Sequence, residues 1–177
     1  ECPELITINK RRYKVFGSLV HTASEPGNIM AAAYWVDISE YADIYDEFIS
    51  SRMICAIIML DNYDELIKNL SEKDKSALLS AIDDKISAWI GGSGGILCKY
   101  DRDRYLFLFA ERHLGGYVAD KFSVLDSVRE TVRAGGLQAT LSIGIGKDGK
   151  TFEENYRFAS LGIEMALSRG GNQAVIK

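Results

Sequence analysis

The sequence predicts an α/β sandwich of the α+β type, preceded by a short run of antiparallel strands. Two observations lead to this prediction. From Met53 onward, apolar runs of strand length alternate with segments whose apolar residues recur every three or four positions. Before residue 39, by contrast, the apolar runs have strand length and are separated by turn-forming residues.

The first 38 residues are expected to form three strands, Leu5–Ile8, Tyr13–His21 and Ile29–Ile38. A basic turn at 9–12 separates the first two strands. The second turn carries Glu25, Pro26, Gly27 and Asn28. Three antiparallel strands without a covering helix make a poor independent core. We therefore interpret them as the trailing end of a larger sheet domain.

Residues 39–52 are expected to form a linker helix. After Asp37 and Ser39, the apolar residues recur at helical spacing: Tyr41, Ile44, Tyr45 and Phe48. A single amphipathic helix between two sheet regions is suited to carry a signal between them. The same periodicity also fits a helix packed on its own domain, and the spacing does not separate the two interpretations.

The central part of the chain begins with a buried strand, Met53–Leu60, and continues with a polar turn and a short helix within 61–70. Ser71 and Asp74 resemble a capping box that opens a longer helix. Its apolar face consists of Leu78, Leu79, Ile82, Ile86 and Trp89. Glycines within 91–95 end this helix, and two strands follow, Ile96–Tyr100 and Tyr105–Ala110, joined by a tight polar hairpin at 101–104.

The last part of the chain is expected to contain a helix, a strand, a second helix and a short final strand. Their ranges are Val118–Arg133, Leu137–Ile145, Phe152–Ser168 and Ala174–Ile176. The inward positions of the second helix are Phe152, Tyr156, Ala159, Ile163 and Ala166. The resulting order β-α-α-β-β-α-β-α-β is that of a ferredoxin-like or nucleotidyl-cyclase-like sandwich. This order indicates a fold class and leaves the chemistry open.

Charge and cysteine content argue against some classes of function. The 177 residues carry a net charge of −4, so the bulk charge gives no support for a nucleic-acid partner. The cysteines Cys2, Cys55 and Cys98 form no CxxC pair, which leaves a zinc or redox motif unsupported. Cys55 and Cys98 lie in apolar runs and are expected to be buried thiols in a reducing compartment. The aromatic residues Trp35, Trp89, Phe107 and Phe109 are expected on core faces.

Four segments, in order, resemble the GGDEF family, whose members condense two GTP molecules into cyclic di-GMP. They are 57–63, 99–105, 141–145 and 159–172, with the sequences IIMLDNY, KYDRDRY, LSIGI and ASLGIEMALSRGGN. The second segment lies where the RLGGDEF signature belongs, on a hairpin between two strands. The resemblance covers about residues 53–177 and implies the nucleotidyl-cyclase-like GGDEF fold.

The resemblance also implies that the cyclase chemistry is lost. A cyclase holds two divalent cations with carboxylates over the triphosphate. In this chain the first metal-binding Asp of the family falls on Met59, and the acidic residue of the signature falls on Arg104. The two signature glycines fall on Asp101 and Arg102, and Asp103 alone keeps the family's Asp. Other nucleotide-contacting or inhibitory positions of the family fall on Ile67, Ser76, Gly92, Gly95 and Leu167.

A narrower resemblance connects the segments 60–66 (LDNYDEL) and 168–174 (SRGGNQA) to the degenerate GGDEF domains of cyclic-di-AMP phosphodiesterases. Proteins of that family have two membrane helices, a PAS domain, the degenerate GGDEF domain and a DHH/DHHA1 catalytic module. The motif VDIS at 36–39 is similar to the junction that closes many PAS domains. The resemblance therefore implies PAS strands at 1–38, a linker helix at 39–52 and the GGDEF domain at 53–177. It also implies a parent protein on the cytoplasmic face of a membrane, with its DHH module outside this chain.

Five residues are candidates for nucleotide contacts: Asp61, Asn62, Arg102, Asp103 and Arg104. The family's weak ATP hydrolysis would make Asp61 and Asp103 the carboxylates for Mg²⁺ bound with ATP or GTP. The alternative is an Asx-rich turn that caps a short helix, next to a solvated hairpin of alternating charge. Three functions stay open at this point: a regulatory relay without a catalytic residue of its own, a weak nucleotide hydrolase, and a homodimerising scaffold.

Overall fold

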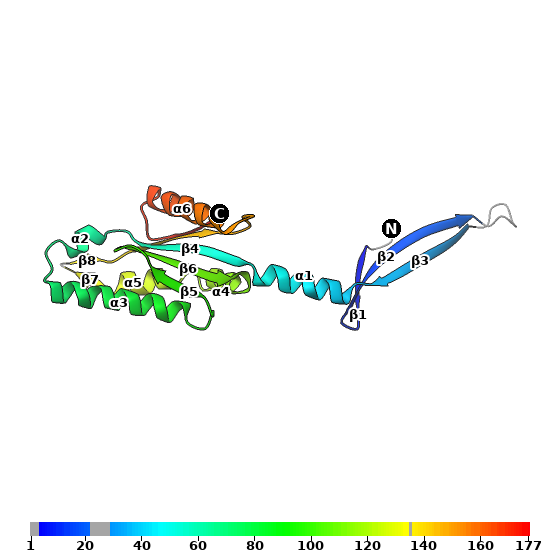
Figure 1. Cartoon of the computed structure of the whole chain (residues 1–177), viewed down its shortest axis with the longest axis horizontal. Coiled ribbons are helices and arrows are strands. Elements are labelled where there is room, and N and C mark those ends of the chain that lie inside the picture. Colours follow the sequence, from blue (N-terminus) through cyan, green and yellow to red (C-terminus); the bar gives the residue numbers. More distant parts are fainter. Residues whose placement is uncertain (1–3, 22–28, 135) are drawn as a thin grey trace. The chain divides into compact units, whose positions relative to one another are not determined.

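The structure is a computed structural model, and it describes residues 4–21, 29–134 and 136–177 (Figure 1). Cys2 and the turn expected at residues 25–28 lie outside these residues. The chain divides into two compact units, 1–50 and 51–177, which we call unit 1 and unit 2. Each unit is described by itself.

Unit 1 contains a three-stranded antiparallel sheet in the order β1-β2-β3. The strands are β1 (Leu5–Ile8), β2 (Arg11–His21) and β3 (Ile29–Asp37), three strands as the sequence predicts, with β2 beginning two residues earlier than expected and β3 ending one residue earlier. Ile8 pairs with Arg11, so Asn9 and Lys10 form a two-residue turn with φ angles of 48° and 65°. Left-handed residues at both central positions are typical of the tight turns that match the twist of a hairpin.

The sheet of unit 1 has little core. Among its described residues, Val15 is the one buried hydrophobic side chain. Trp35, which pairs with Val15, is 50% exposed, and Phe16 is 48% exposed. The expectation that Trp35 lies in a core is therefore wrong for this unit. Apolar and polar residues alternate in the strands of unit 1, as in a half-buried sheet, but the described part of unit 1 supplies no second layer to bury the apolar face.

The helix α1 (Ser39–Ser51) follows β3, so a helix forms where the sequence predicts one. The amide of Ser39 donates to Asp37 Oδ1 at 3.0 Å, and this bond fixes the start of the helix. The guanidinium of Arg12 on β2 binds the carboxylates of Asp43 and Asp46, each at 2.6 Å. These two carboxylates raise the pKa of Arg12. The polar side of α1 is thus attached to the sheet, while none of its residues is buried.

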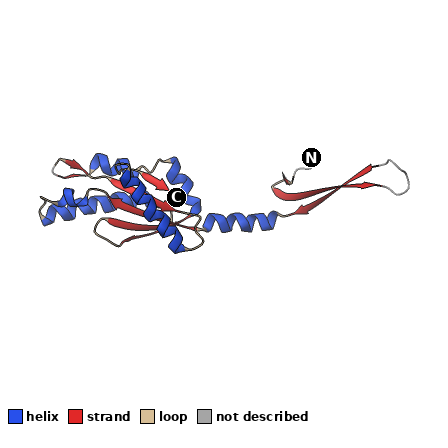
Figure 2. Cartoon of the chain, turned by 90° about the horizontal axis from the view of Figure 1, so that it is seen from above, coloured by secondary structure: helices blue, strands red, loops and turns tan. Residues whose placement is uncertain are grey.

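Unit 2 is built on a five-stranded sheet in the order β10-β9-β4-β6-β5. The strands are β4 (Met53–Leu60), β5 (Ile96–Lys99), β6 (Arg104–Ala110), β9 (Leu141–Gly146) and β10 (Ala174–Ile176). β10 is parallel to β9, and the other pairs are antiparallel. This mixed sheet with helices on both faces confirms the predicted fold class (Figures 1 and 2).

Two apolar clusters cover the two faces of this sheet. The larger one joins the sheet to α2 (Tyr63–Ile67), α3 (Glu72–Ile90), α4 (Leu114–Ala119) and α5 (Val124–Thr131). The smaller one joins Cys55 and Ile57 of β4 to Ala159 and Ile163 of α6 (Phe152–Ser168). Glycine makes the second contact possible, because a Cβ atom at Gly146 would lie 1.8 Å from the carbonyl oxygen of Asn155.

The helix predicted at 118–133 is wrong. The structure has two shorter helices, α4 and α5, and between them Lys121 and Phe122 have left-handed φ angles of 55° and 54°. The Asp120 carboxylate accepts hydrogen bonds from the Trp89 indole at 3.2 Å and from the Ser123 hydroxyl at 2.9 Å. These contacts stabilise the break between α4 and α5, whereas the apolar periodicity by itself predicts one continuous helix.

Three smaller predictions about unit 2 are also wrong. The strand predicted at 137–145 is divided into β8 (Leu137–Gln138), which pairs with β7 (Arg133–Ala134), and β9. Cys98 is exposed, because it lies on the edge strand β5. Phe152 and Tyr156, which were expected to point inward, are 48% and 37% exposed. Among the described residues, no helix is long and apolar enough to cross a membrane.

Candidate functional site

A shallow cavity of about 320 Å³ lies at the end of β4, next to the β5–β6 hairpin. The amide of Leu60 donates to the carbonyl of Asp103 at 2.9 Å, which brings the hairpin against the turn after β4. The cavity is lined by Met59, Leu60, Asp61, Asn62, Tyr63, Asp64, Glu65 and Asp103. The structure therefore brings together three of the five predicted site residues, Asp61, Asn62 and Asp103.

One carboxylate oxygen of Asp61 makes a structural hydrogen bond. Its Oδ2 accepts a hydrogen bond from the amide of Asn172 at 2.9 Å. The neighbouring Gly171 has a φ of 73°, and a Cβ there would lie 2.7 Å from Asp61 Oδ2. Asp61 thus joins the end of β4 to the loop between α6 and β10. Its other oxygen, Oδ1, is buried and has no hydrogen-bond partner among the described residues.

Asn62 also makes structural contacts. Its Nδ2 donates to the carbonyl of Gln138 at 2.8 Å, and its Oδ1 accepts from the amide of Thr140 at 3.4 Å. These bonds hold the bend between β8 and β9. Asn62 precedes α2, but its side chain makes no capping bond to that helix.

Arg102 closes the hairpin against the cavity rim. Its guanidinium lies 3.3 Å from Asp64 Oδ1 and 5.3 Å from the centre of the Tyr63 ring. A cation–π contact and an exposed ion pair are each weak, but here they act on the same side chain. Asp64 and Tyr63 are therefore partners of the hairpin that the motif comparison did not identify.

Arg104 lies apart from the three residues that the cavity collects. It begins β6, pairs with Met59 of β4, and does not line the cavity. Its guanidinium lies beside the hydroxyl of Tyr100. The pKa of Tyr100 is raised by burial and by Tyr156, and Arg104 partly opposes this shift.

Tyr105 follows as a buried anchor of the same hairpin. Its hydroxyl donates to Asp83 on α3, and Asp83 also binds Lys99 Nζ at 3.4 Å. Burial raises the pKa of Tyr105 well above its usual range, and the hydrogen bond to Asp83 is the second-largest cause of this shift. Sequence reasoning missed Asp83, because periodicity assigns the residues beside Ile82 to a solvated helix face.

The charges of the cavity favour cations over anions. Four of its eight lining residues carry carboxylates: Asp61, Asp64, Glu65 and Asp103. Such a lining repels a bare triphosphate and requires a bound cation to offset it. Within the described residues, no group of three or more His, Cys, Asp or Glu is placed to hold a metal ion. The protein alone therefore does not form a closed magnesium cage, and Mg²⁺ would need phosphate oxygens to complete its shell.

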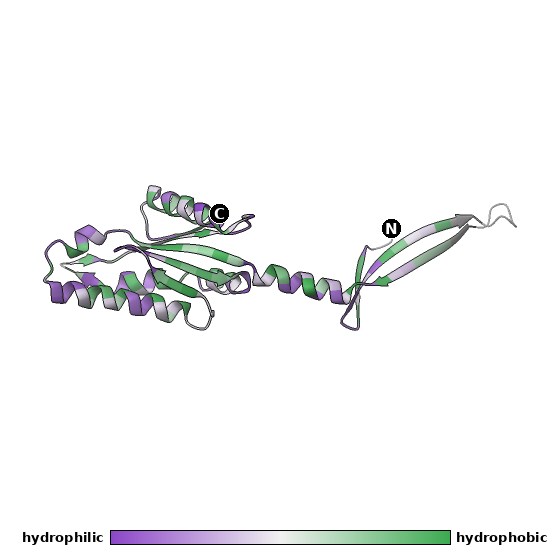
Figure 3. Cartoon of the chain, viewed as in Figure 1, coloured by the Kyte–Doolittle hydropathy of each residue, from purple (hydrophilic) through white to green (hydrophobic). Residues whose placement is uncertain are grey.

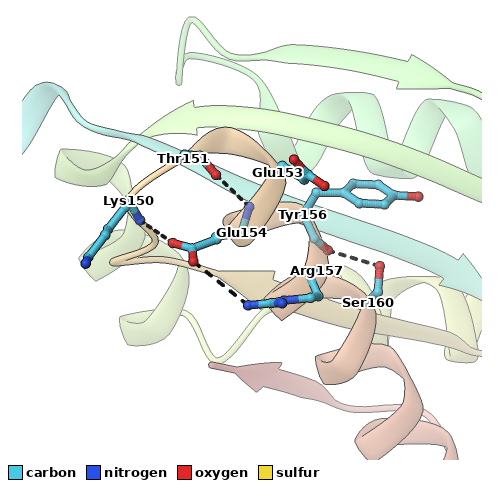
Figure 4. A pocket seen from close by; sticks show the side chains of 7 residues that line it. All are labelled: Lys150, Thr151, Glu153, Glu154, Tyr156, Arg157 and Ser160. Atoms are coloured by element: carbon cyan, nitrogen blue, oxygen red, sulfur yellow. Dashed lines mark hydrogen bonds and ion pairs between the residues drawn. The ribbon is translucent and has the colours of Figure 1, made fainter.

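A larger surface cavity of about 650 Å³ lies at the start of α6 (Figure 4). Its residues are Lys150, Thr151, Glu153, Glu154, Tyr156, Arg157 and Ser160. The Glu154 carboxylate accepts from the Lys150 amide at 2.7 Å and lies 3.9 Å from Arg157. Thr151 caps the helix by accepting from the Glu154 amide at 3.2 Å. These pairings are those of a helix start, and no motif in the sequence points to this cavity.

The sheet order and the hairpin between β5 and β6 define the fold of a GGDEF domain. Solved GGDEF domains share this fold. The active GGEEF domain of a diguanylate cyclase from Vibrio cholerae superposes with a TM-score of 0.63 at 12% identity, over 77% of this chain and 89% of that one. The FimX GGDEF domain from Pseudomonas aeruginosa gives 0.60 at 19% identity, over 78% and 92%.

The chain belongs to the family described as "Cyclic-di-AMP phosphodiesterase GdpP-like, GGDEF domain", whose profile matches residues 58–177. The cyclic-di-AMP phosphodiesterase GdpP of Geobacillus thermodenitrificans is 32% identical over 174 residues, which are 98% of this chain and 25% of the relative. GdpP of Bacillus subtilis is 30% identical over 174 residues, again 98% of this chain and 25% of the relative. The chain thus spans about a quarter of the length of these curated relatives. The predicted family is confirmed.

Proposed function

We propose that this chain is a regulatory domain of a cyclic-di-AMP phosphodiesterase and that it lacks diguanylate cyclase activity. The observation that carries this proposal is the β5–β6 hairpin. Arg104 stands where the GGDEF signature has an acidic residue, and Met59 stands opposite it on β4. Arg102 stands where the signature has a glycine, and it is held by Asp64 and Tyr63.

These contacts support loss of the cyclase chemistry for two reasons. A guanidinium and a thioether are poor ligands for a hard cation such as Mg²⁺. In addition, the backbone of a glycine pair can approach a nucleotide closely, whereas Asp101 and Arg102 place side chains there. The hairpin is thus stabilised as part of the fold instead of being kept open for GTP.

The test has two parts. The purified chain with GTP and Mg²⁺ is expected to form no cyclic di-GMP, and formation that is lost in Asp103→Ala would contradict the proposal. In the full-length parent, deletion of residues 53–177 is expected to change the rate of cyclic-di-AMP hydrolysis by about fivefold or more, the usual size of an allosteric coupling. An unchanged rate and unchanged nucleotide response would overturn the regulatory role.

A second candidate is a weak Mg²⁺-dependent ATPase or nucleotide-binding domain. It is favoured by Asp61 Oδ1, which is buried without a partner in the described structure, beside a cavity that Asp103 also lines. When bound, Mg²⁺ would neutralise phosphate oxygens there, and the two carboxylates would orient it. ATP and GTP are the nucleotides we expect, with Asn62, Arg102 and Arg104 as further candidate contacts.

Asp103→Asn is the sharper test of this candidate, because Asp61 also binds the Asn172 amide. Calorimetric titration with ATP, GTP, cyclic di-GMP and cyclic di-AMP in Mg²⁺ would identify the ligand. ATP turnover is expected to fall about tenfold or more in Asp103→Asn, because the amide would lose the negative charge that holds Mg²⁺ against the phosphates. Asp101→Asn, next to it on the exposed turn, is expected to leave turnover unchanged. Turnover that survives Asp103→Asn would indicate a contaminant.

We further propose that residues 1–38 are the last strands of a PAS domain and that the parent lies at the cytoplasmic face of a membrane. The uncovered sheet of unit 1 supports the first point. A relative named "Membrane protein-large ribosomal subunit bL9 fusion protein" from Aster yellows witches'-broom phytoplasma, at 27% identity over 83% of this chain, supports the membrane association but not the face. The DHH/DHHA1 module is expected elsewhere in the parent. Membrane fractionation of the full-length protein tests the location.

A further inference from the structure

Three buried side-chain oxygens of unit 2 have no hydrogen-bond partner within the described residues: Asp61 Oδ1, Ser142 Oγ and Asn172 Oδ1. Ser142 is 0% exposed. Most of β4, which leads to Asp61, is green in Figure 3, the colour of hydrophobic residues. Buried polar atoms are nearly always paired with protein, with water or with an ion, so these three oxygens need an explanation.

Ser142 lies on the side of the sheet that α6 covers. Alternate side chains of a strand point to opposite faces of a sheet. A Cβ atom at Gly144 would lie 2.1 Å from the carbonyl oxygen of Ala159 on α6, so Ser142, two residues earlier on β9, faces the same way. Ser142 also pairs with Met59 of β4, and Met59 packs against the smaller apolar cluster on the α6 side.

The loop between α6 and β10 brings Asn172 to the same corner of the sheet. The amide of Asn172 donates to Asp61 Oδ2 at 2.9 Å, and the carbonyl of Gln173 accepts from the amide of Ile143 at 2.9 Å. Because β9 lies between β4 and β10, Ser142 is flanked by Asp61 at the end of β4 and by Asn172 before β10. The three oxygens therefore belong to one polar corner.

The charge of this corner favours a cation over a water molecule. Within the described structure, the Asn172 amide donates to one oxygen of the Asp61 carboxylate, and the other oxygen has no donor. A buried charge is costly unless an opposite charge offsets it. A water molecule supplies hydrogen bonds without charge, whereas a monovalent cation contacts the oxygens and also balances the one carboxylate. A divalent cation prefers several carboxylates, and the described residues place no group of three or more His, Cys, Asp or Glu to hold one.

We propose that Asp61 Oδ1, Ser142 Oγ and Asn172 Oδ1 bind a buried alkali cation, Na⁺ or K⁺. Carboxylate, hydroxyl and amide oxygens are hard ligands, which suit hard cations. The three ligands come from the turn after β4, from β9 and from the loop before β10. The cation thus joins three segments that are distant in the sequence, and it holds Asp61 in place beside the acidic cavity that Asp61 also lines.

This inference goes beyond the proposed regulatory role, and it gives Asp61 Oδ1 a different partner from the Mg²⁺ of the ATPase candidate. Asp103 distinguishes the two sites. Asp103 lines the acidic cavity, whereas neither Ser142 nor Asn172 does. A change at Asp103 should therefore weaken the binding of Mg²⁺ with ATP and leave the alkali cation bound.

Thermal unfolding of the 177-residue chain in three salts of equal ionic strength tests the charge of the occupant. We expect the midpoint in about 100 mM KCl or NaCl to exceed that in choline chloride by about 2–4 °C, because choline is too large for the site. Ser142→Ala should abolish this difference. Ser160→Ala is the matched control, since its hydroxyl donates to the Tyr156 carbonyl on α6, and it should keep the difference. Asp103→Asn should keep it as well.

Two results would overturn the cation site. One is an equal midpoint in all three salts for the unmodified chain. The other is a salt difference that persists in Ser142→Ala. If Ser142→Ala lowered the midpoint by the same amount in every salt, a bridging water would be the occupant, and the proposal would be wrong.

Crystallography identifies the occupant directly and needs no variant. If the site holds Na⁺, crystals grown in NaCl should show oxygen distances below about 2.5 Å, shorter than the hydrogen bonds of a water molecule. If it holds K⁺, crystals soaked in a thallium(I) salt should show an anomalous peak between the three oxygens. Distances of hydrogen-bond length in both crystals, without an anomalous peak, would overturn the proposal.

Discussion

The two units of this chain use strands of similar apolar content in different ways. In unit 2, Phe107 is fully buried between layers, whereas in unit 1 Phe16 is 48% exposed. The difference follows from what covers each sheet. Helices cover both faces in unit 2, and among the described residues of unit 1 the one helix, α1, is attached through ion pairs. Apolar composition therefore sets a potential for burial, and the presence of a second layer decides whether it is realised.

Cutting the chain between the units is expected to have the largest effect. A fragment of residues 51–177 should unfold cooperatively, with a midpoint within a few degrees of that of the whole chain. A fragment of residues 1–50 should show no cooperative transition, because a three-stranded sheet without a covering layer is marginal in water. Calorimetry and circular dichroism measure both. A sharp transition in the short fragment would break the comparison.

Gly146→Ala should be the most damaging point change in unit 2. The added Cβ would lie 1.8 Å from the carbonyl oxygen of Asn155, and backbone cannot move aside cheaply. We expect a loss of about 3 kcal/mol or more in the free energy of unfolding, measured with urea. Gly115→Ala is the control, because a Cβ there meets nothing within 4 Å. It should be neutral or stabilise the protein by up to about 1 kcal/mol.

Cys55 should make unit 2 sensitive to alkaline pH. Burial raises the pKa of its thiol from 9.0 to about 11. The unfolded chain then loses the proton while the folded chain keeps it, so the stabilisation is complete below pH 9 and is lost between about pH 9 and 11. The loss is at most about 2–3 kcal/mol.

The measurement is urea unfolding at several pH values. Cys55→Ala should flatten the slope between pH 9 and 11, whereas Cys98→Ala should not, because Cys98 is exposed. Equal slopes in all three proteins would mean that the Cys55 thiol is not protected.

The smallest expected effect comes from making the same substitution, Phe→Leu, once in each unit and comparing the two losses of stability. Phe107→Leu removes buried ring atoms and should cost about 1–2 kcal/mol. Phe16→Leu, on the uncovered sheet, should change stability by less than about 0.5 kcal/mol. Chemical unfolding followed by near-ultraviolet circular dichroism measures both. Equal losses in the free energy of unfolding would show that Phe16 is buried under the conditions of the experiment.

Much of the fold could be predicted from local pattern. The bounds expected for β1, β4, β10 and α6 agree with the structure, because each is an apolar run or a helical repeat between turn-forming residues. Ser71 caps α3 as expected, by accepting from the Asp74 amide. The helix expected at 118–133 was wrong, because the left-handed backbone at Lys121 and Phe122 depends on contacts with Trp89.

The candidate site was predictable in part. The motif placed Asp61, Asn62 and Asp103 near each other, and the cavity collects all three. Their partners were not predictable. Asp61 binds the amide of Asn172, which is 111 residues away, and Asn62 binds Gln138, which is 76 residues away. Such contacts carry no local periodicity.

The sequence by itself determined the fold class, the family and the substitutions at Met59, Arg102 and Arg104, because each is written in short stretches of residues. The tertiary structure alone decided how the hairpin is held, with Arg102 on Asp64 and Tyr105 on Asp83. It also decided that Trp35 and Cys98 are exposed. Burial and side-chain pairing depend on which distant segment comes to lie alongside, and that is a property of the packed chain.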